Sequence, residues 1–295
     1  TAGFVERGAQ PKPGKLAALK RDGKLPGVLV ESDHSEGISN GRGMKGKNEP
    51  ELLYLDLDML VVSKPSGLPT VPDGYDTDRP YLAGLLEPTF GRVWVVHRLD
   101  RDTSGVVVLA RNADAHKSLS AQFQEHQVVK TYHALVMGHP TWQERSVSAP
   151  LRVDADRQHR TIIDLEAGKP STTHFRLLEK FQSPLTQVSL VEATPKHGRT
   201  HQIRVHLCTL GMPVAADPLY GNGAQLMLSA IKRQYQSSEN GERPLIGRLA
   251  LHALSITLTH PTSGQTRTFE APYPKDFTAA LKQLRKHASR QTHSI

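Results

Sequence analysis

Short apolar runs separated by polar turns divide most of this chain. Runs at residues 52–54 and 59–63 predict two strands joined by an acidic turn. The unbroken apolar run at 106–110 predicts a fully buried strand, and 172–178 with 187–194 predict an antiparallel pair. Many short strands with few helical segments favour an α+β fold.

Helical spacing appears in a few places. Asn112 is a suitable N-cap for a helix over 113–125, whose apolar positions recur four residues apart. A further helix is predicted from about 200 to 210, with Gly211 as its C′ residue. The last helical pattern lies near the end of the chain, before a basic tail.

The second of these helices places an arginine beside its apolar face. Arg204 lies three residues before Leu207, so the two side chains share one side of the helix. A guanidinium on an apolar side is costly unless it meets a carboxylate, and we expect Asp100 to be that partner.

The first 48 residues differ from the rest. They are rich in glycine and basic residues and contain few apolar clusters, so they cannot bury enough surface to offset the entropy of ordering. We expect a flexible basic arm at 1–48, a catalytic domain at 49–280, and the end of a helix with a basic tail at 281–295. The arm either adds phosphate contacts or has no role.

Charge and cysteine content narrow the class of protein. Lys and Arg number 37 against 29 Asp and Glu, which favours a polyanionic partner, although ordinary solubility explains the same excess. Cys208 is the only cysteine, so an intrachain disulfide is impossible and a reducing compartment is expected. The sequence contains neither an apolar run of ~20 residues nor a signal-peptide pattern, so we expect a cytoplasmic protein without membrane contact.

The densest group of reactive side chains lies between two apolar runs, at residues 95–108. Asp100 stands between Arg98 and Arg101, whose charges favour an ionised carboxylate. A placed carboxylate can act as a nucleophile or a general base. The alternative is a charged turn on a surface.

Residues 97–105 read HRLDxxTSG, which resembles the active-site motif of the RluA-type pseudouridine synthases. Two further matches follow that family's order: a KPxG motif at 64–67 and GRTHQIRVHL at 198–207. With the segments 211–214 and 217–221, the resemblance covers roughly residues 50 to 280.

The resemblance implies both fold and reaction. It implies a mixed, largely antiparallel sheet split into two subdomains around an RNA-binding cleft. The implied reaction converts uridine to pseudouridine inside rRNA or tRNA, with no cofactor and no metal. We expect a monomer that acts on a structured stem-loop. His201 and His206 are five residues apart, a poor spacing for a shared metal on one helix.

The resemblance also implies residue roles. Asp100 would attack C1′ of the ribose or take a proton from C2′, and Arg204 would pair with it. Arg98 would occupy the space left by the flipped base, Tyr132 would stack on the uracil, and Leu207 would form an apolar floor. The other expected site residues are supports of the loop (His97, Thr103 and Ser104) and RNA contacts (Lys64, Arg199 and His201).

One position departs from the family pattern, which usually has glycine where Ala216 stands. Alanine avoids positive φ, so we expect a differently shaped turn there. Two other functions stay open: an inactive RNA-binding factor on the same fold, and a nuclease or glycosidase. A glycosidase needs a second carboxylate, for which Asp102 is the candidate.

Overall fold

The structure, a computed structural model, describes residues 49–72, 76, 78–183, 185–236 and 241–291. The basic arm expected at 1–48 lies outside the described residues. None of the helices in the described part of the chain has the length and apolar character that crossing a bilayer requires.

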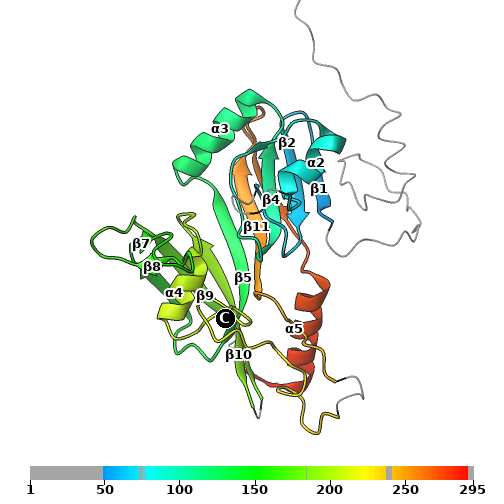
Figure 1. The fold of residues 1–295 in the computed structure, drawn as a ribbon, viewed down its shortest axis with the longest axis vertical. Helices are drawn as coiled ribbons and strands as arrows, with labels where there is room; N and C mark the ends of the chain where they lie inside the picture. The colour runs from blue at the N-terminus through cyan, green and yellow to red at the C-terminus, as the bar shows by residue number, and fades with distance from the viewer. Residues whose placement is uncertain (1–48, 73–75, 77, 184, 237–240, 292–295) are drawn as a thin grey trace, which may run out of the picture.

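An eleven-stranded sheet forms the framework of the described residues (Figure 1). Its central order is β1-β2-β4-β11-β5-β10-β9-β13, with β12 paired to β11, β3 to β4 and β6 to β9, while β7 and β8 form a separate pair. All pairings are antiparallel except β4 with β11. The strands are β1 (Glu51–Leu55), β2 (Met59–Lys64), β3 (Trp94–Val95), β4 (Ser104–Ala110), β5 (Val129–Met137), β6 (Glu144–Ser148), β7 (Leu151–Arg152), β8 (Ile162–Ile163), β9 (Thr172–Gln182), β10 (Gln187–Pro195), β11 (Leu251–Thr259), β12 (Thr266–Glu270) and β13 (Ser289–Gln291). The α+β fold with a largely antiparallel sheet is therefore confirmed.

Four described helices pack on this sheet: α2 (Leu82–Phe90), α3 (Ala113–Gln124), α4 (Gln202–Thr209) and α5 (Lys275–His287). The Asn112 side chain caps α3 by accepting a hydrogen bond from the Ala115 N–H at 2.8 Å, as predicted. Gly211, beyond the end of α4, has a φ of 73°, which confirms its C′ position. α3 packs against β4 and β11, whereas α4 packs against β9 and β10.

The sheet carries two hydrophobic cores. One gathers side chains from β9, β10, α4 and α5, and the other gathers side chains from β1, β2, β4, α2 and α3. β5 runs from the upper part of the molecule into the lower part (Figure 1). Its Tyr132 packs against both cores and so marks the boundary between two subdomains.

The turn at Ala216 does not follow the sequence prediction. Ala216 adopts a φ of 56°, the left-handed conformation that we expected alanine to avoid. Backbone hydrogen bonds hold the turn: the Ala215 N–H donates to Leu135 O at 2.8 Å and the Ala250 N–H donates to Ala215 O at 3.0 Å. These bonds offset a left-handed cost of roughly 1–2 kcal/mol, so Ala216 is held in the left-handed conformation.

Gly105 is required by the one parallel pairing. It lies opposite Ala253 of β11 with a φ of 125°, and a Cβ atom there would be 2.1 Å from the Ala253 carbonyl oxygen. The close approach explains why glycine follows Ser104 at the start of β4.

Gly105→Ala should therefore lower the free energy of unfolding by about 3 kcal/mol or more, from left-handed strain and from the backbone clash. Gly264→Ala is a matched control, because Gly264 also has a positive φ (69°) but a Cβ there meets nothing within 4 Å. It should cost only about 1–2 kcal/mol. Urea unfolding followed by circular dichroism measures the free energy of unfolding of both variants. Equal losses of stability in the two would show that the close approach of β4 to β11 does not make alanine more costly at position 105.

Candidate active site

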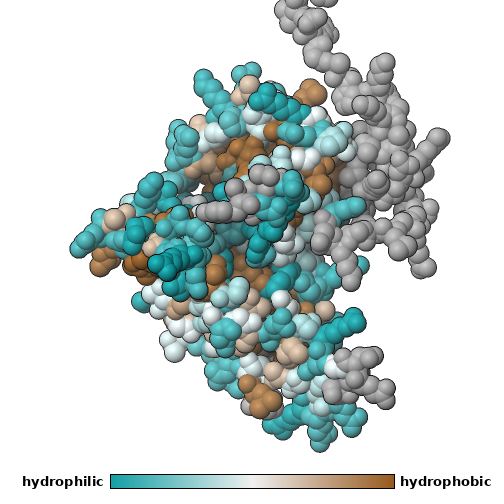
Figure 2. Space-filling model, in the orientation of Figure 1, coloured by the Kyte–Doolittle hydropathy of each residue, from teal (hydrophilic) through white to brown (hydrophobic). Residues whose placement is uncertain are grey.

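A cavity of about 540 Å³ lies between the two subdomains. Its walls come from the turn before β4, the start of β5, the end of α3 and the N-terminal part of α4. On the face that Figure 2 shows, hydrophilic side chains gather across the middle of the molecule. The predicted site residues in its lining are His97, Arg98, Asp100, Thr103, Tyr132, Arg199, His201 and Arg204.

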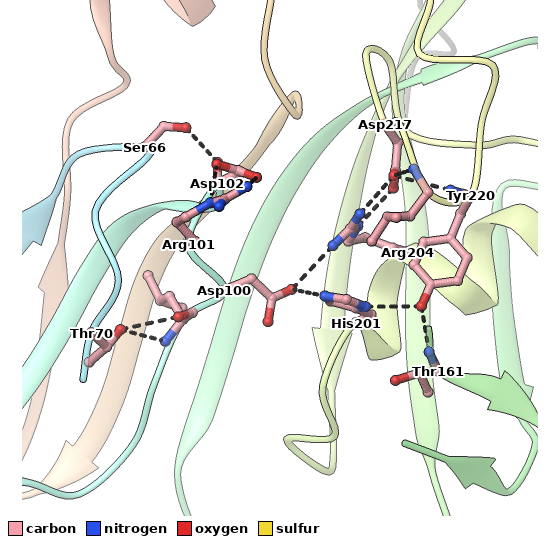
Figure 3. A network of polar contacts seen from close by, with 12 residues as sticks. Ser66, Thr70, Asp100, Arg101, Asp102, Thr161, His201, Arg204, Asp217 and Tyr220 are labelled. Carbon is pink, nitrogen blue, oxygen red and sulfur yellow. Dashed lines mark hydrogen bonds and ion pairs between the residues drawn. The ribbon is translucent and has the colours of Figure 1, made fainter. Parts of the chain in front are cut away.

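Asp100 meets two basic side chains from the opposite wall. Its Oδ2 lies 3.8 Å from Arg204 Nη1 and 3.9 Å from His201 Nε2 (Figure 3). The expected Arg204 contact is present, as an ion pair longer than a hydrogen bond. Arg101, whose charge was expected to favour an ionised Asp100, donates to the Asp102 carboxylate at 3.2 and 3.3 Å.

The closest partner of Arg204 is Asp217, which the sequence analysis did not assign. Nε and Nη2 of Arg204 donate to the two Asp217 oxygens at 2.8 and 2.7 Å, and both side chains are buried. Burial raises the pKa of Asp217, but the hydrogen bonds and charge of Arg204 outweigh this, so the pKa lies below its usual value. Asp100 is thus the second partner of an arginine already held at two points.

Tyr220 joins the two basic residues. Its ring centroid lies 5.0 Å from the Arg204 guanidinium carbon, a cation–π distance. Its hydroxyl lies 2.9 Å from His201 Nδ1 and accepts a hydrogen bond from the Thr161 N–H at 2.8 Å. Asp217 and Tyr220 belong to the segment at 217–221 that resembles the family, which is the sequence signal for their importance.

Tyr132 stands across the cavity from α4. Burial, followed by the charge of Asp100, raises the pKa of the Tyr132 phenol. The phenol therefore stays protonated at neutral pH. A neutral aromatic ring beside the Asp100 carboxylate offers a face on which a base can stack.

Lys64 is not placed to contact RNA, so that expectation is wrong. Its side chain is buried, and Nζ donates to the carbonyls of Pro65, Leu68 and Arg101 at 3.0, 2.7 and 3.0 Å. Burial lowers the pKa of Lys64 to about 7. An ammonium group saturated by three carbonyls holds the turn and has no donor left for a phosphate.

Two more side chains join this turn to the Asp100 turn. Ser66 Oγ donates to Asp102 O at 2.7 Å. Thr70 Oγ1 donates to Leu99 O at 3.1 Å and accepts from the Leu99 N–H at 3.2 Å (Figure 3). The KPxG segment is therefore a brace for the turn that carries Asp100.

The three expected loop supports behave differently. His97 Nε2 accepts the Val108 N–H at 3.0 Å and the ring stacks on Phe123, while burial lowers the pKa of His97 to about 3 and keeps it neutral. Ser104 bonds to the distant His252, Oγ to Nδ1 at 3.0 Å, rather than locally. Thr103 does not brace the loop through its hydroxyl: Oγ1 is buried without a hydrogen-bond partner, and the N–H donates to Asp100 O at 3.1 Å.

Leu207 does not reach the cavity, contrary to its expected place under the base. It is fully buried in the core between α4 and the sheet. The helix turns its Ile203 toward the cavity instead, and Leu251 of β11 lines it as well. Ile203 and Leu251 thus join Val96, Leu99, Phe123 and Tyr132 as apolar or aromatic lining residues that a base can contact, while Leu207 stays in the core.

The cavity is strongly basic. Arg98, Lys130, Arg199 and Arg204 line it, and Asp100 is the only carboxylate among its described lining residues. Burial lowers the pKa of Lys130 to about 8, so most of it is charged at neutral pH. A basic cleft of this kind attracts the phosphates of a nucleic acid.

Asp56, Asp58 and His260 form the one group of described residues with metal-like spacing, and it lies outside the cavity. Asp56 Oδ2 accepts from the Tyr54 hydroxyl at 2.7 Å and lies 2.7 Å from His260 Nε2. Its Oδ1 accepts from two backbone N–H groups. These hydrogen bonds account for the cluster as a link between the β1–β2 and β11–β12 turns.

Residues 58–209 match the sequence pattern of the RNA pseudouridylate synthase family. The chain belongs to that family. Its activity is that of an RNA pseudouridine synthase, an isomerase, as the motifs predicted.

Similar proteins agree with this family. The chain is 35% identical to a ribosomal large subunit pseudouridine synthase D of Pseudomonas aeruginosa, over 92% of this chain and 87% of that protein. It is 34% identical to the dual-specificity RNA pseudouridine synthase RluA of Salmonella typhi, over 78% of this chain and 98% of that protein. Among solved structures, human RNA pseudouridylate synthase domain containing 1 matches with a TM-score of 0.63 and 28% identity. The match covers 86% of this chain and 94% of that one.

Asp217→Asn should lower the free energy of unfolding of this synthase by about 3–5 kcal/mol, because it leaves the Arg204 charge buried beside a neutral amide. Glu192→Gln is the matched control: it weakens a two-point pair with Arg176, in which the Arg176 and Glu192 side chains are 45% and 21% exposed, together with a 3.6 Å contact to His133, and should cost about 1 kcal/mol or less.

The same pair has a pH signature. Because the folded-state pKa of Asp217 is lowered, its stabilisation is present above the unfolded value near 4 and is lost as the pH falls through the folded value. The Asn variant should lack this part of the acid dependence. Chemical denaturation at several pH values measures it, and a variant as stable as wild type would contradict the pair's role.

Proposed function

We propose that this synthase converts uridine to pseudouridine in structured ribosomal or transfer RNA, with Asp100 acting on the ribose of a flipped-out uridine. The observation that supports this most is the meeting of Asp100, Tyr132 and Arg204 around one cavity. They come from three separate segments of the chain, the turn before β4, β5 and α4, and all three line this cavity.

The reaction explains why these residue types suffice. The bond between C1′ and N1 breaks, the uracil turns while held, and C5 joins C1′. The proton lost from C5 is balanced by one gained at N1, so substrate and product are isomers. The reaction thus needs a carboxylate and a binding surface, with no net oxidant or co-reactant.

Asp100 has two possible actions. Its carboxylate can attack C1′ and displace N1 of the uracil, or it can take the C2′ proton to form a glycal. Both contacts to the opposite wall fall on Oδ2, which leaves Oδ1 without either. Arg204 supplies a positive charge without the two-point bond that would occupy both oxygens.

Tyr132 and Arg98 handle the base. A stacked uridine must leave its helix at a cost of a few kcal/mol, and stacking on Tyr132 returns ~1–3 kcal/mol. The exposed Arg98 lies beside Asp100 at the cavity. From there its side chain can fill the place that the base has left.

The RNA class rests on relatives and charge. Relatives are named for the large ribosomal subunit or for dual specificity. Basic side chains line the cavity, which suits a folded RNA with closely spaced phosphates. We propose that the chain acts as a monomer in the cytoplasm.

A two-carboxylate glycosidase is disfavoured. Asp102 pairs with Arg101 and is absent from the cavity lining, so the second acid that such an enzyme needs is missing from the described site. An inactive RNA-binding factor is disfavoured because Asp100, Tyr132 and Arg204 are all in place.

Asp100→Asn should abolish pseudouridine formation, a loss of at least about 10²–10⁴-fold, because the amide can neither attack C1′ nor take a proton. RNA affinity should stay within about tenfold, since one neutralised charge alters phosphate binding modestly. Asp102→Asn, on the same turn, should keep most activity. Single-turnover assays on transcribed rRNA and tRNA measure both, and full activity in Asp100→Asn would refute the mechanism.

Pseudouridine mapping should identify the substrate. Carbodiimide labelling and sequencing of total RNA, with and without this chain, should show one or a few sites that vanish. They should return with wild type and not with Asp100→Asn. If no site changes and the purified protein is also inactive on rRNA and tRNA, the proposal fails.

A further inference from the structure

The His201 ring bridges the Asp100 carboxylate and the Tyr220 hydroxyl. Nε2 faces Asp100 Oδ2 at 3.9 Å, and Nδ1 lies 2.9 Å from the Tyr220 oxygen (Figure 3). The Tyr220 oxygen also receives the Thr161 N–H at 2.8 Å. A chain of polar groups therefore runs from the backbone before β8 to Asp100.

The donors in this group of contacts favour one placement of the protons. The Thr161 N–H can only donate, so the Tyr220 oxygen accepts there and its own proton is free for His201 Nδ1. A neutral imidazole carries one N–H and one acceptor nitrogen. With Nδ1 as the acceptor, the ring proton lies on Nε2, the nitrogen that faces the Asp100 carboxylate.

The surroundings keep this ring neutral. Burial lowers the pKa of His201 below its ordinary value, and Arg204 and Arg98 act in the same direction. Asp100 and Asp217 raise it, yet the net direction is down. The ring therefore offers Asp100 a hydrogen-bond donor without adding a second full positive charge.

The backbone at His201 is held in an unusual conformation. His201 precedes α4 at the N-cap position with a φ of 55°, and its side chain makes no capping hydrogen bond. Strained positions of this kind concentrate at functional sites. The His201 side chain does not cap the helix, and its ring faces Tyr220 and Asp100 instead.

We propose that His201 is a positioning residue: Tyr220 and Thr161 fix its tautomer so that Nε2–H orients the Asp100 carboxylate for its action on the ribose. This rests on the proposed function of Asp100. The 3.9 Å separation shortens to a hydrogen bond in the RNA complex, as catalytic contacts commonly do. His201 then does not serve chiefly as an RNA contact.

Two amide variants separate this role from a structural one. In His201→Gln the terminal amide reaches the place of Nε2 and can donate to Asp100. In His201→Asn the amide reaches only the place of Nδ1, near Tyr220. Asparagine is among the residues that best tolerate a positive φ, so His201→Asn should remain folded.

The expected result is a loss of rate without a loss of binding. At saturating RNA, the single-turnover rate should fall by about 10²-fold in His201→Asn and by less than about tenfold in His201→Gln. The RNA dissociation constant should change by less than about threefold in both. Tyr220→Phe should also slow the reaction. In the double variant with His201→Asn it should lower the rate little further, because both residues act through the same series of hydrogen bonds.

Nitrogen NMR of histidine-labelled protein reads the tautomer directly. The His201 signal, assigned by its disappearance in His201→Asn, should show Nδ1 as an acceptor and Nε2 as protonated in wild type. In Tyr220→Phe the Nδ1 resonance should shift, because its donor is gone. Circular dichroism checks that each variant is folded.

Three outcomes would overturn the proposal: His201→Asn as fast as wild type, equal losses in the Asn and Gln variants, or a proton found on Nδ1. Lost RNA affinity with an unchanged rate would make His201 an RNA contact. If His201→Asn fails to fold, Tyr220→Phe alone decides, and an unchanged rate there refutes the role. A wild-type chain that forms no pseudouridine would refute the proposed function itself, which separates the two failures.

Discussion

The buried pair of Arg204 and Asp217 is the interaction on which the site depends. Asp217 binds the guanidinium at two points and fixes its plane, so a third nitrogen faces Asp100 at a longer distance. Asp217 is the hydrogen-bonded partner of Arg204, and Asp100 lies beyond hydrogen-bond distance from it. The pair thus supplies positive charge to the cavity while leaving the reactive carboxylate loosely held.

The opposite wall of the cavity contains the polar turn with Asp100, which hydrogen bonds hold in place. Lys64, Ser66 and Thr70 supply hydrogen bonds to main-chain groups of the Asp100 turn. Main-chain partners fix the path of the turn whatever its side chains do. One subdomain therefore presents the carboxylate, and the other presents the groups that orient it.

Tyr132 belongs to both subdomains, since it packs against both cores at the start of β5. A base that stacks on this ring lies at the junction of the two walls. In the proposed reaction, recognition of the base and the action of the Asp100 carboxylate on the ribose take place at this boundary. Basic side chains line the cavity on both walls, where their charge favours the binding of phosphates.

Local patterns determined much of the fold. The strands of β1, β2 and β4, the Asn112 cap of α3 and the Gly211 end of α4 all follow from periodicity and backbone preferences, which act over a few residues. The motif at 97–105 likewise identified Asp100, and the pattern of α4 predicted that Arg204 needs a carboxylate. Each of these depends on neighbours in sequence.

The tertiary structure decided how those residues are partnered. Arg204 bonds to Asp217 at two points, Arg101 donates to the Asp102 carboxylate, and Ser104 bonds to His252 on the adjacent strand β11. Lys64 and Leu207 are buried where the sequence suggested a contact with RNA. Ala216 takes a left-handed turn because distant strands hold its neighbours. The sequence by itself predicted that Asp100, Tyr132 and Arg204 belong to one site, and the structure places all three in the lining of one cavity. Only the packing of distant segments determined which atoms face one another, because burial and hydrogen-bond partners are settled by segments far apart in the chain.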